Sequence, residues 1–210
     1  MDAMRQMYKK GSPTQTLPWR EGLKKVSPTR GDLEGAYKLF IFTPMHIITQ
    51  TPRLIIREFL PEELETYLHH FSDEEVCLYI PKRTTDERIT IFHTALANYA
   101  NTKLTGIWGM FNKETGEFIG SCLLRPFNGD VKVTEVGYSM DKKYWGQGIA
   151  TEMTEAMIAH TFSDTNVDEI VGVTELENIG SQRVLEKAGL KRVDNFFRDG
   201  LELAFFRKAR

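Results

Sequence analysis

Gly146 and Gly148 stand two residues apart, directly after the aromatic pair Tyr144 and Trp145 and directly before an apolar segment with helical spacing. Because glycine has no side chain, backbone N–H groups at these positions lie bare. The first turn of a helix adds unpaired N–H donors and a partial positive charge. A strand, a glycine loop and a helix in this order indicate a site for a phosphate or pyrophosphate.

Two common phosphate loops do not fit the residues that follow. A Walker A loop ends in Gly-Lys-Ser/Thr, whereas Gly148 is followed by Ile149, Ala150 and Thr151 with no lysine. A dinucleotide fingerprint needs glycine or alanine at the position of Thr151, and a βαβ unit with an acidic residue after its second strand. The sequence shows neither feature clearly.

A third pattern fits the loop better. Trp145-x-x-Gly148-x-Ala150 resembles the acetyl-CoA loop of the Gcn5-related N-acetyltransferase (GNAT) superfamily, Arg/Gln-x-x-Gly-x-Gly/Ala. The first position departs from that pattern, because Trp145 replaces arginine or glutamine. The whole stretch from Tyr144 is similar to the variant in the branch that includes the ribosomal-protein alanine N-acetyltransferases (RimJ/RimL-like).

Two further segments carry the same resemblance. The segment from Glu177 to Leu190 resembles the family's Asn-x-x-Ser-x-Arg-Val-Leu-Glu-Lys-x-Gly-Phe motif, one strand and one helix after the glycine loop. The segment from Thr51 to Arg57 resembles the family's opening strand. Three motifs in the family's order are more specific than any one of them.

The resemblance implies contacts with acetyl-CoA as the acyl-donor cosubstrate, without a metal. Backbone N–H groups of the loop are expected to bind the pyrophosphate with the helix dipole, and the pantetheine amides to pair with the edge of the strand near Tyr138 and Met140, as an added strand would. Asn178 is expected to bond the pantetheine arm, or to be a plain helix cap, or both. The expected donor-binding residues are Tyr138, Met140, Trp145, Gly146, Gln147, Gly148, Ile149, Ala150, Thr151 and Asn178.

Glu135 is the candidate general base. An alkyl ammonium is mostly charged at neutral pH, so a base, usually acting through water, must take its proton. Glu135 precedes Val136-Gly137-Tyr138 on the strand beside the expected thioester. The competing interpretation is a solvent-facing strand glutamate. An N–H near Met140 is expected to stabilise the tetrahedral oxyanion.

The general acid is less well defined. Relatives carry a tyrosine four residues before the motif glycine, where this chain has Leu185. Ser181 resembles the serine proposed for that role in the ribosomal branch, although a hydroxyl donates poorly and its role reduces to a hydrogen bond to the sulfur. Tyr138 is another candidate, and the thiolate could also leave unassisted. The histidines at 69, 70 and 93 are expected at the surface or at the edge of the cleft.

The elements that must position these residues alternate in a recognisable order. Apolar periodicity predicts a strand near Arg53–Phe59, a helix after Pro61, capping boxes that start helices at Ser72 and Thr84, and then three strands joined by turns. The loop helix, a buried strand, a second helix and a final hairpin follow. The resemblance implies an α+β acyl-CoA N-acyltransferase (GNAT) fold, with a mixed, mostly antiparallel sheet of about seven strands flanked by helices.

Length and composition indicate the domain organisation and the class of protein. With 210 residues, 41% hydrophobic and 27% charged, the chain suits one soluble domain. Residues 1–44 hold eight basic and four acidic residues with several prolines, and predict a flexible basic extension before a catalytic domain at 45–210. A net charge of −2 disfavours nucleic acid, no apolar run predicts a membrane segment, and two cysteines without metal or redox spacing favour a cytoplasmic protein.

The resemblance implies an N-acetyltransferase that moves an acetyl group from acetyl-CoA to a primary amine by direct attack in a ternary complex. The acceptor is a protein N-terminal α-amine or a small-molecule amine, and the protein is a monomer or a homodimer. An alternative is a catalytically weak CoA-binding sensor or interaction protein on the same fold, which the missing tyrosine allows. Transfer of a longer acyl group is a further alternative.

Overall fold

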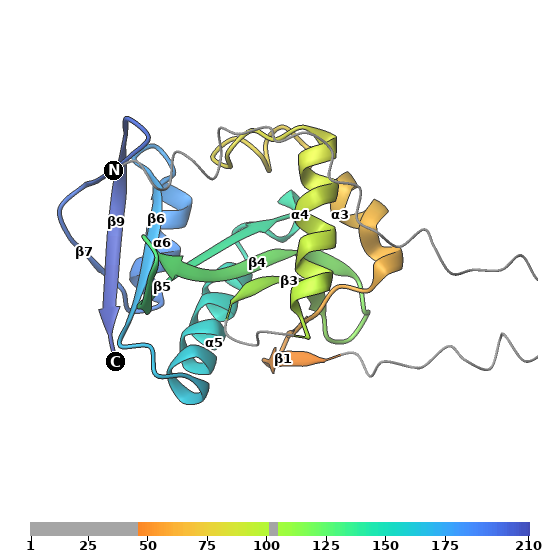
Figure 1. Ribbon diagram of the computed structural model, residues 1–210, viewed down its shortest axis with the longest axis horizontal. Coiled ribbons are helices and arrows are strands. Elements are labelled where there is room, and N and C mark those ends of the chain that lie inside the picture. The colour runs from red at the N-terminus through yellow and green to blue at the C-terminus, as the bar shows by residue number, and fades with distance from the viewer. Residues whose placement is uncertain (1–45, 101–104) are drawn as a thin grey trace, which may run out of the picture. The chain divides into compact units, whose positions relative to one another are not determined.

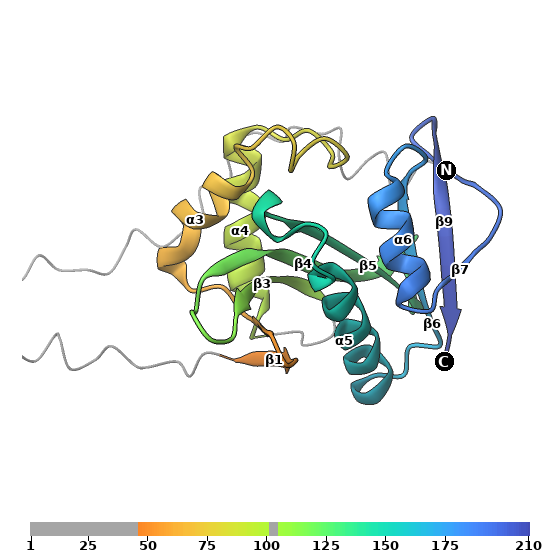
Figure 2. The same cartoon turned by 180° about the vertical axis from the view of Figure 1, so that it is seen from behind.

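The structure, a computed structural model, describes residues 46–100 and 105–210, all within one compact unit that runs from Pro44 to Arg210. The predicted extension at 1–44 lies outside the described residues. The described chain forms a nine-stranded sheet with helices on both faces (Figures 1 and 2). This confirms the predicted α+β fold with a mixed, mostly antiparallel sheet, which has nine strands instead of about seven.

The first half of the sheet is an antiparallel series in chain order. It consists of β1 (Ile47–Gln50), β2 (Leu54–Arg57), β3 (Gly106–Asn112), β4 (Phe118–Phe127) and β5 (Asp130–Met140). The turn between β4 and β5 holds Asn128 and Gly129 with φ of 50° and 81°. Both positions need left-handed backbone angles, which asparagine and glycine adopt at least cost, so the predicted hairpin forms there.

The second half of the sheet begins where the chain crosses over. Strand β6 (Glu169–Glu175) runs parallel to β5, and β9 (Leu201–Ala209) pairs antiparallel with β6. Two short strands, β7 (Lys191–Arg192) and β8 (Phe196–Arg198), both pair with β9. The turn between β8 and β9 contains Asp199 and Gly200, both with positive φ, as the sequence predicts.

In the part of the chain that the structure describes, four α-helices form the two outer layers. Helices α3 (Leu64–His70), which follows the short 3-10 turn η2 (Pro61–Glu63), and α4 (Thr85–Asn98) lie on the face seen in Figure 1. Helices α5 (Ile149–Asp164) and α6 (Ile179–Lys187) cover the opposite face, seen in Figure 2. The inner side of α5 buries Met153 and Met157 completely against the sheet, as its apolar spacing predicts.

One predicted helix is wrong. Residues 72–80 form a series of turns, without a helix after Ser72. The Ser72 hydroxyl donates to the carbonyl of His69, and the carboxylate of Asp73 accepts instead from the N–H of Glu75, 2.8 Å away. Cys77 therefore lies in a turn and not on a helix. The second capping box is confirmed, because Thr84 and Glu87 each accept a hydrogen bond from the other's backbone.

Within the described residues, none of the helices has the length and apolar character needed to cross a bilayer. The same part of the chain contains no cluster of three or more histidine, cysteine or acidic side chains suited to hold a metal ion.

Candidate functional site

The glycine loop, Trp145–Ala150, ends at the N-terminus of α5. Gly146 and Gly148 have φ of 73° and 76°, and Gly148 is the N-cap of the helix. A Cβ on Gly146 would meet nothing within 4 Å, so glycine is needed there for its backbone angle and not for space. No side chain among the described residues caps α5. The first turn of a 16-residue helix therefore presents N–H donors and a positive dipole end, as an anion site requires.

Arg53, directly before β2, binds this loop through its side chain. Its Nη1 donates to the carbonyl of Gln147 at 2.9 Å and its Nε donates to Glu152 Oε2 at 2.6 Å. Its backbone N–H donates to the other oxygen of Glu152 at 3.0 Å. Burial acts to raise the pKa of Glu152, but hydrogen bonds from Thr51 and Arg53 outweigh it and the pKa is lowered. The opening-strand motif is thus coupled to the glycine loop by a charged, hydrogen-bonded contact.

The side chains of the loop also fix its course. The indole Nε1 of Trp145 donates to the carbonyl of Met140 at 2.7 Å, while 45% of the tryptophan stays exposed. The amide of Gln147 donates to the carbonyl of Lys143 at 2.6 Å. Tyr144 donates to Glu117 at 2.6 Å, and Lys143 forms an ion pair with the same carboxylate. The loop is therefore held by contacts within the chain itself.

Strands β5 and β6 separate beside this loop. Their parallel pairing covers only Val133 with Glu169, Thr134 with Ile170 and Glu135 with Val171. Beyond these pairs β5 continues to Met140 and β6 to Glu175 without pairing to each other. The described strands thus leave an unpaired edge on β5 next to the N-terminus of α5, where Tyr138 and Met140 lie.

The residues predicted from the second motif lie across this gap. Asn178 caps α6, because its Oδ1 accepts a hydrogen bond from the N–H of Ser181 at 3.1 Å. Burial raises the pKa of the Tyr138 phenol, and a hydrogen bond with the Ser181 side chain partly opposes this rise. Leu185 is buried against Gly172 of β6, where it replaces the family tyrosine with an apolar contact.

Glu135 is bound by two arginines. Its carboxylate accepts hydrogen bonds from Arg125 at 2.7 and 3.2 Å and from Arg198 at 2.9 and 3.2 Å, and only 8% of its side chain is exposed. Burial acts to raise the pKa of Glu135, but the hydrogen bonds and charges of Arg198 and Arg125 outweigh it and the pKa is lowered. The carboxylate is neither the solvent-facing glutamate of the competing interpretation nor a free base of near-neutral pKa.

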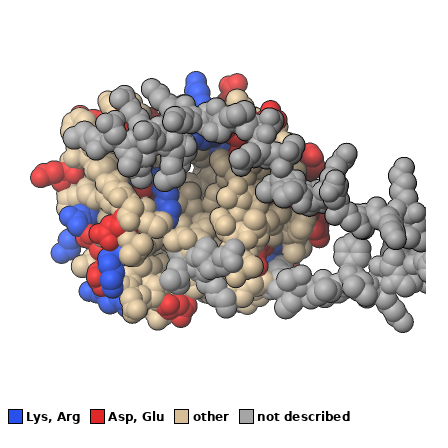
Figure 3. Space-filling view, in the orientation of Figure 1, with Lys and Arg blue, Asp and Glu red and all other residues tan. Residues whose placement is uncertain are grey.

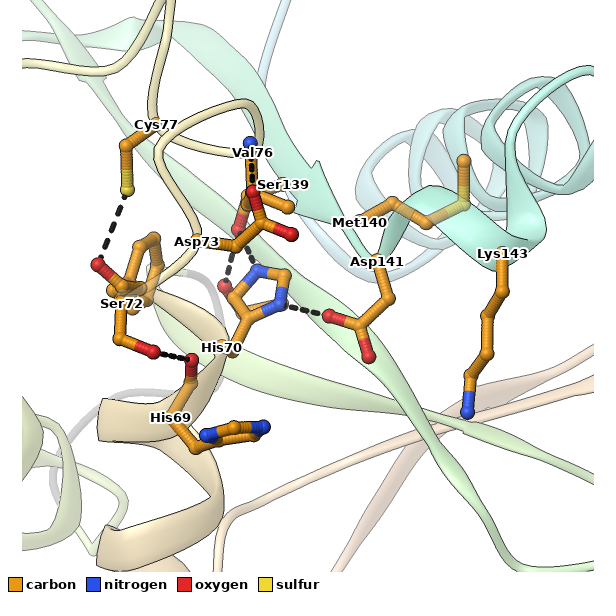
Figure 4. A network of polar contacts seen from close by, with 12 residues as sticks. His69, His70, Ser72, Asp73, Val76, Cys77, Ser139, Met140, Asp141 and Lys143 are labelled. Carbon is orange, nitrogen blue, oxygen red and sulfur yellow. Dashed lines mark hydrogen bonds and ion pairs between the residues drawn. The ribbon is translucent and has the colours of Figure 1, made fainter.

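A second polar network lies at the end of β5, and the sequence did not predict it (Figure 4). His70 is 3% exposed, so it is not a surface residue, although it lines a cavity together with His69, in agreement with the alternative expectation of a position at the edge of a cleft. Its Nδ1 contacts Asp141 Oδ1, and its Nε2 lies 2.8 Å from the hydroxyl of Ser139, which lies 3.0 Å from that of Ser121. An ionised carboxylate only accepts, so Nδ1 carries the proton and Nε2 accepts from Ser139. Burial lowers the pKa of His70, which agrees with a neutral ring.

The structure therefore brings the predicted residues together in two groups. The glycine loop with Thr151 at the start of α5 forms one, and Tyr138, Met140, Asn178 and Ser181 border the gap between β5 and β6. Four charged or polar residues were missed by sequence reasoning: His70, Arg125, Asp141 and Arg198. Because side chains alternate along a strand, Ser139 lies on the same face of β5 as Glu135. This alternation was the one feature of the sequence that could have placed Ser139 near the site.

Comparison with known proteins adds the family. The acetyltransferase (GNAT) domain family matches residues 53–191. The chain is 28% identical over 152 residues to an uncharacterized N-acetyltransferase, YoaA of Bacillus subtilis (strain 168), a match that covers 70% of this chain and 85% of that protein.

Two more relatives widen the comparison. The chain is 34% identical over 123 residues to an FsC-acetyl coenzyme A-N(2)-transacetylase of Aspergillus fumigatus, which covers 54% of this chain and 51% of that protein. Among solved structures, the ribosomal L7/L12 alpha-N-protein acetyltransferase RimL in complex with coenzyme A superposes with a TM-score of 0.67 at 14% identity, over 78% of this chain and 98% of that one. At that identity the likeness concerns the fold.

Proposed function

The chain belongs to the GNAT acetyltransferase family, and from this premise we propose that it transfers an acetyl group from acetyl-CoA to a primary amine by direct attack in a ternary complex. N-acetyltransferase activity is the family's chemistry. The finer parts of the proposal are the donor contacts, the roles of Glu135 and Ser181, and an acceptor that is either a peptide N-terminal α-amine or a small-molecule amine.

One observation carries the proposal. The N-terminus of α5, with two left-handed glycines and no side-chain cap among the described residues, opens beside the unpaired edge of β5. The first feature suits a pyrophosphate and the second suits the amides of a pantetheine arm. In this proposal the N–H groups of Trp145–Ala150 bind the pyrophosphate with the help of Thr151. The edge at Tyr138 and Met140 and the amide of Asn178 bind the arm.

Glu135 has a defined but limited role in the proposed reaction. Because two arginines lower its pKa, the carboxylate is ionised throughout the neutral range and accepts a hydrogen bond from the incoming ammonium or from a water. The proton then leaves through water, and the neutral amine attacks the thioester carbonyl. As the C–S bond breaks, the nitrogen gives up one more proton, to water or to the departing thiolate, and the amide forms. The N–H near Met140 stabilises the oxyanion that forms.

Ser181 and Tyr138 act on the departing sulfur. Leu185 offers no proton, so the hydroxyl pair is the proposed source of hydrogen bonds to the thiolate. Because the pKa of Tyr138 is raised, its phenol stays protonated at neutral pH and remains a donor. The thiolate is the less basic leaving group of the tetrahedral intermediate, so hydrogen bonds to it need not be accompanied by full protonation.

The test is a binding measurement followed by an acceptor screen. Calorimetry with the purified chain should show binding of CoA and acetyl-CoA, and CoA release should then rise with at least one member of a panel of free amines and peptides with different first residues. Binding without release for every amine would favour the CoA-binding sensor. An absence of heat with CoA, together with binding of an unrelated nucleotide, would remove the proposal.

A further inference from the structure

Among the described residues, helices cover only part of the sheet face opposite α5 and α6. Helix α4 packs on β3 and α3 on β4, while β6 and β9 lie to one side of α4 (Figure 1). Figure 3 views this face and shows charged side chains of both signs gathered on the β9 side, next to a broad area that is mostly uncharged. A substrate that approaches the gap between β5 and β6 from the side away from α5 would pass over this face of the sheet.

An aromatic pocket lies on this face. The rings of Phe127, Phe196 and Phe205 have centroids 5.2 to 5.4 Å apart. With Val133 and Val171 they line a cavity of about 290 Å³. This is close to the lower end of the volumes of small-molecule sites, about 300 Å³, and its walls are suited to an apolar or aromatic group.

The cluster of Glu135, Arg125 and Arg198 adjoins this pocket. Glu135 pairs in register with Arg125 on one side and with Val171 of the pocket on the other. The guanidinium of Arg198 lies 5.3 Å from the ring centre of Phe196 and 5.6 Å from that of Phe127. Apolar walls and charged groups thus form one continuous surface at the point where the strands begin to separate.

The cluster carries one positive charge in excess. Two guanidinium groups share the single carboxylate of Glu135, and the side chains of Arg125 and Arg198 are 53% and 29% exposed. None of the other charged groups that line the pocket forms an ion pair with the two arginines. Arg207 and Glu169 form an ion pair with each other, and Asp130 lies at the hairpin end of β5 and accepts from the N–H of Lys132.

We propose that Arg125 and Arg198 select an acceptor amine that carries a carboxylate, and that the pocket of Phe127, Phe196 and Phe205 receives an apolar group of the same acceptor. This inference rests on the proposed acetyl transfer. A carboxylate completes the charge balance of the cluster and finds guanidinium donors in the fixed geometry that favours carboxylates. A polyamine or another polycation meets like charge at the same place and is disfavoured.

Two sources supply this chemistry, a free amino acid and a peptide with an acidic side chain near its N-terminus. The first arm of the test compares phenylalanine with phenylalanine amide, and the second compares the peptide Ala-Asp-Phe amide with Ala-Asn-Phe amide. The amide of an amino acid has the less basic amine and hence more of the reactive neutral form. A preference for phenylalanine over its amide therefore runs against intrinsic reactivity.

The variants are Arg125→Gln and a matched control, Lys132→Gln. Both remove one positive charge from a side chain that is 53% exposed, but Lys132 contacts Asn166 and Asp168 and not the cluster. In at least one of the two substrate pairs, we expect the wild type to prefer the member with the carboxylate by about tenfold or more in kcat/KM. This is the size of effect that a hydrogen bond between charged groups gives. Arg125→Gln should lose most of that preference and Lys132→Gln should keep it, with CoA affinity unchanged in both.

The outcomes separate this inference from the proposed function. Equal kcat/KM within both pairs, in a wild-type enzyme that binds CoA and acetylates other amines, overturns the selection of carboxylates and leaves acetyl transfer intact. Preservation of the preference in both Arg125→Gln and Arg198→Gln also overturns it. Failure to bind CoA at all overturns both proposals. Calorimetry with CoA verifies that each variant is folded before kinetics are compared.

Discussion

The imidazole of His70 contacts the carboxylate of Asp141 through Nδ1, and so joins the buried end of α3 to the turn η3 (Lys142–Tyr144) that leads into the glycine loop. Asp141 is the N-cap of this turn. The other ring nitrogen of His70 reaches Ser139, one residue before Met140, on which the proposed oxyanion site depends. One side chain therefore connects the helical layer with both the donor loop and the end of β5.

Removal of this connection should affect both stability and donor binding. We expect His70→Ala to lower the free energy of unfolding by about 1–3 kcal/mol, because Ser139 and Asp141 lose a buried partner, and to weaken CoA binding severalfold. Urea unfolding and calorimetry measure the two effects. His69→Ala is the matched control, because the neighbouring histidine is exposed. Equal effects of the two substitutions would show that the network has no special role.

The same histidine should make stability depend on pH. Burial lowers the pKa of His70 below its ordinary value of 6.5 and outweighs the contact with Asp141, which raises it. Between the lowered pKa of the folded chain and the ordinary value of 6.5, the unfolded chain binds more protons at His70 than the folded one. The contribution of neutral His70 to the free energy of unfolding is therefore complete above pH 6.5 and is lost as the pH falls towards the lowered pKa.

The measurement is urea unfolding of the wild type and of His70→Gln across this range. The difference in free energy of unfolding should be constant well above pH 6.5 and should shrink as the pH falls below it. Titrating groups that do not contact His70 are common to both proteins and cancel in the difference. A difference that grows on acidification would mean that His70 is charged in the folded state.

The backbone angle of the glycine loop gives a third prediction. Gly146→Ala places a Cβ in open space but at φ of 73°, so we expect a loss of stability of about 1–2 kcal/mol and weaker CoA binding from a distorted loop. Gly116→Ala is a close control, with φ of 71° and no atom within 4 Å of its Cβ, in the turn between β3 and β4. It should lose the same stability without a change in CoA affinity, as measured by calorimetry.

The sequence predicts the local features of this site well. The turn between β4 and β5 and the cap at Asn178 each depend on neighbouring residues and are confirmed. Contacts between distant residues were not predictable in this way. His70 lies 71 positions from Asp141, and nothing in its own segment marks it as buried.

Register explains why the partners of Glu135 were missed. Counting back from the Asn128-Gly129 turn places Lys132 opposite Arg125. The pairing is irregular between Pro126 and Phe127, and this shift brings Arg125 opposite Glu135 instead. Proline cannot donate to the ladder and is tolerated at such bulges, but its presence does not give the size of the shift. Arg198, 63 positions away on β8, then adds the second guanidinium.

Glu135 itself supplies the fourth prediction. Glu135→Gln should leave CoA affinity unchanged and lower kcat by about tenfold or more, because the neutral amide no longer offers a charged acceptor to the incoming ammonium or to its water. Because the pKa of Glu135 is lowered, the acidic limb of the rate profile of the wild type should follow the pKa of the acceptor amine and should move when a less basic amine is used. A limb that stays fixed for amines of different pKa would contradict this.

The control for this substitution is Glu63→Gln. Glu63 also binds an arginine through both carboxylate oxygens, Arg57 at 2.6 and 2.9 Å, but at the start of α3. Loss of an ion pair alone should therefore cost stability in both variants and turnover in only one. Acetyl-CoA turnover and urea unfolding, measured together, separate the two contributions.

The hydroxyl pair at Tyr138 and Ser181 gives the last prediction. If Ser181 holds the departing sulfur, Ser181→Ala should lower kcat about tenfold, equivalent to about 1.4 kcal/mol in the transition state. The cap of α6 should persist, because Asn178 accepts from the backbone N–H of Ser181 and not from its hydroxyl. CoA affinity and stability should then change little, and Ser181→Thr, which keeps the hydroxyl, should retain most of the rate.

Tyr138→Phe tests whether the two hydroxyls act as a unit. Because the Ser181 side chain lowers the pKa of the Tyr138 phenol, the two hydroxyls interact, and the double variant should lose less activity than two independent losses would predict. The raised pKa of Tyr138 also predicts that kcat shows no basic limb from its ionisation below pH 10, its ordinary value. Single-turnover rates with saturating acetyl-CoA measure these effects on the chemical step. Full activity of Ser181→Ala would mean that the thiolate leaves without this hydroxyl, since its own acidity suffices.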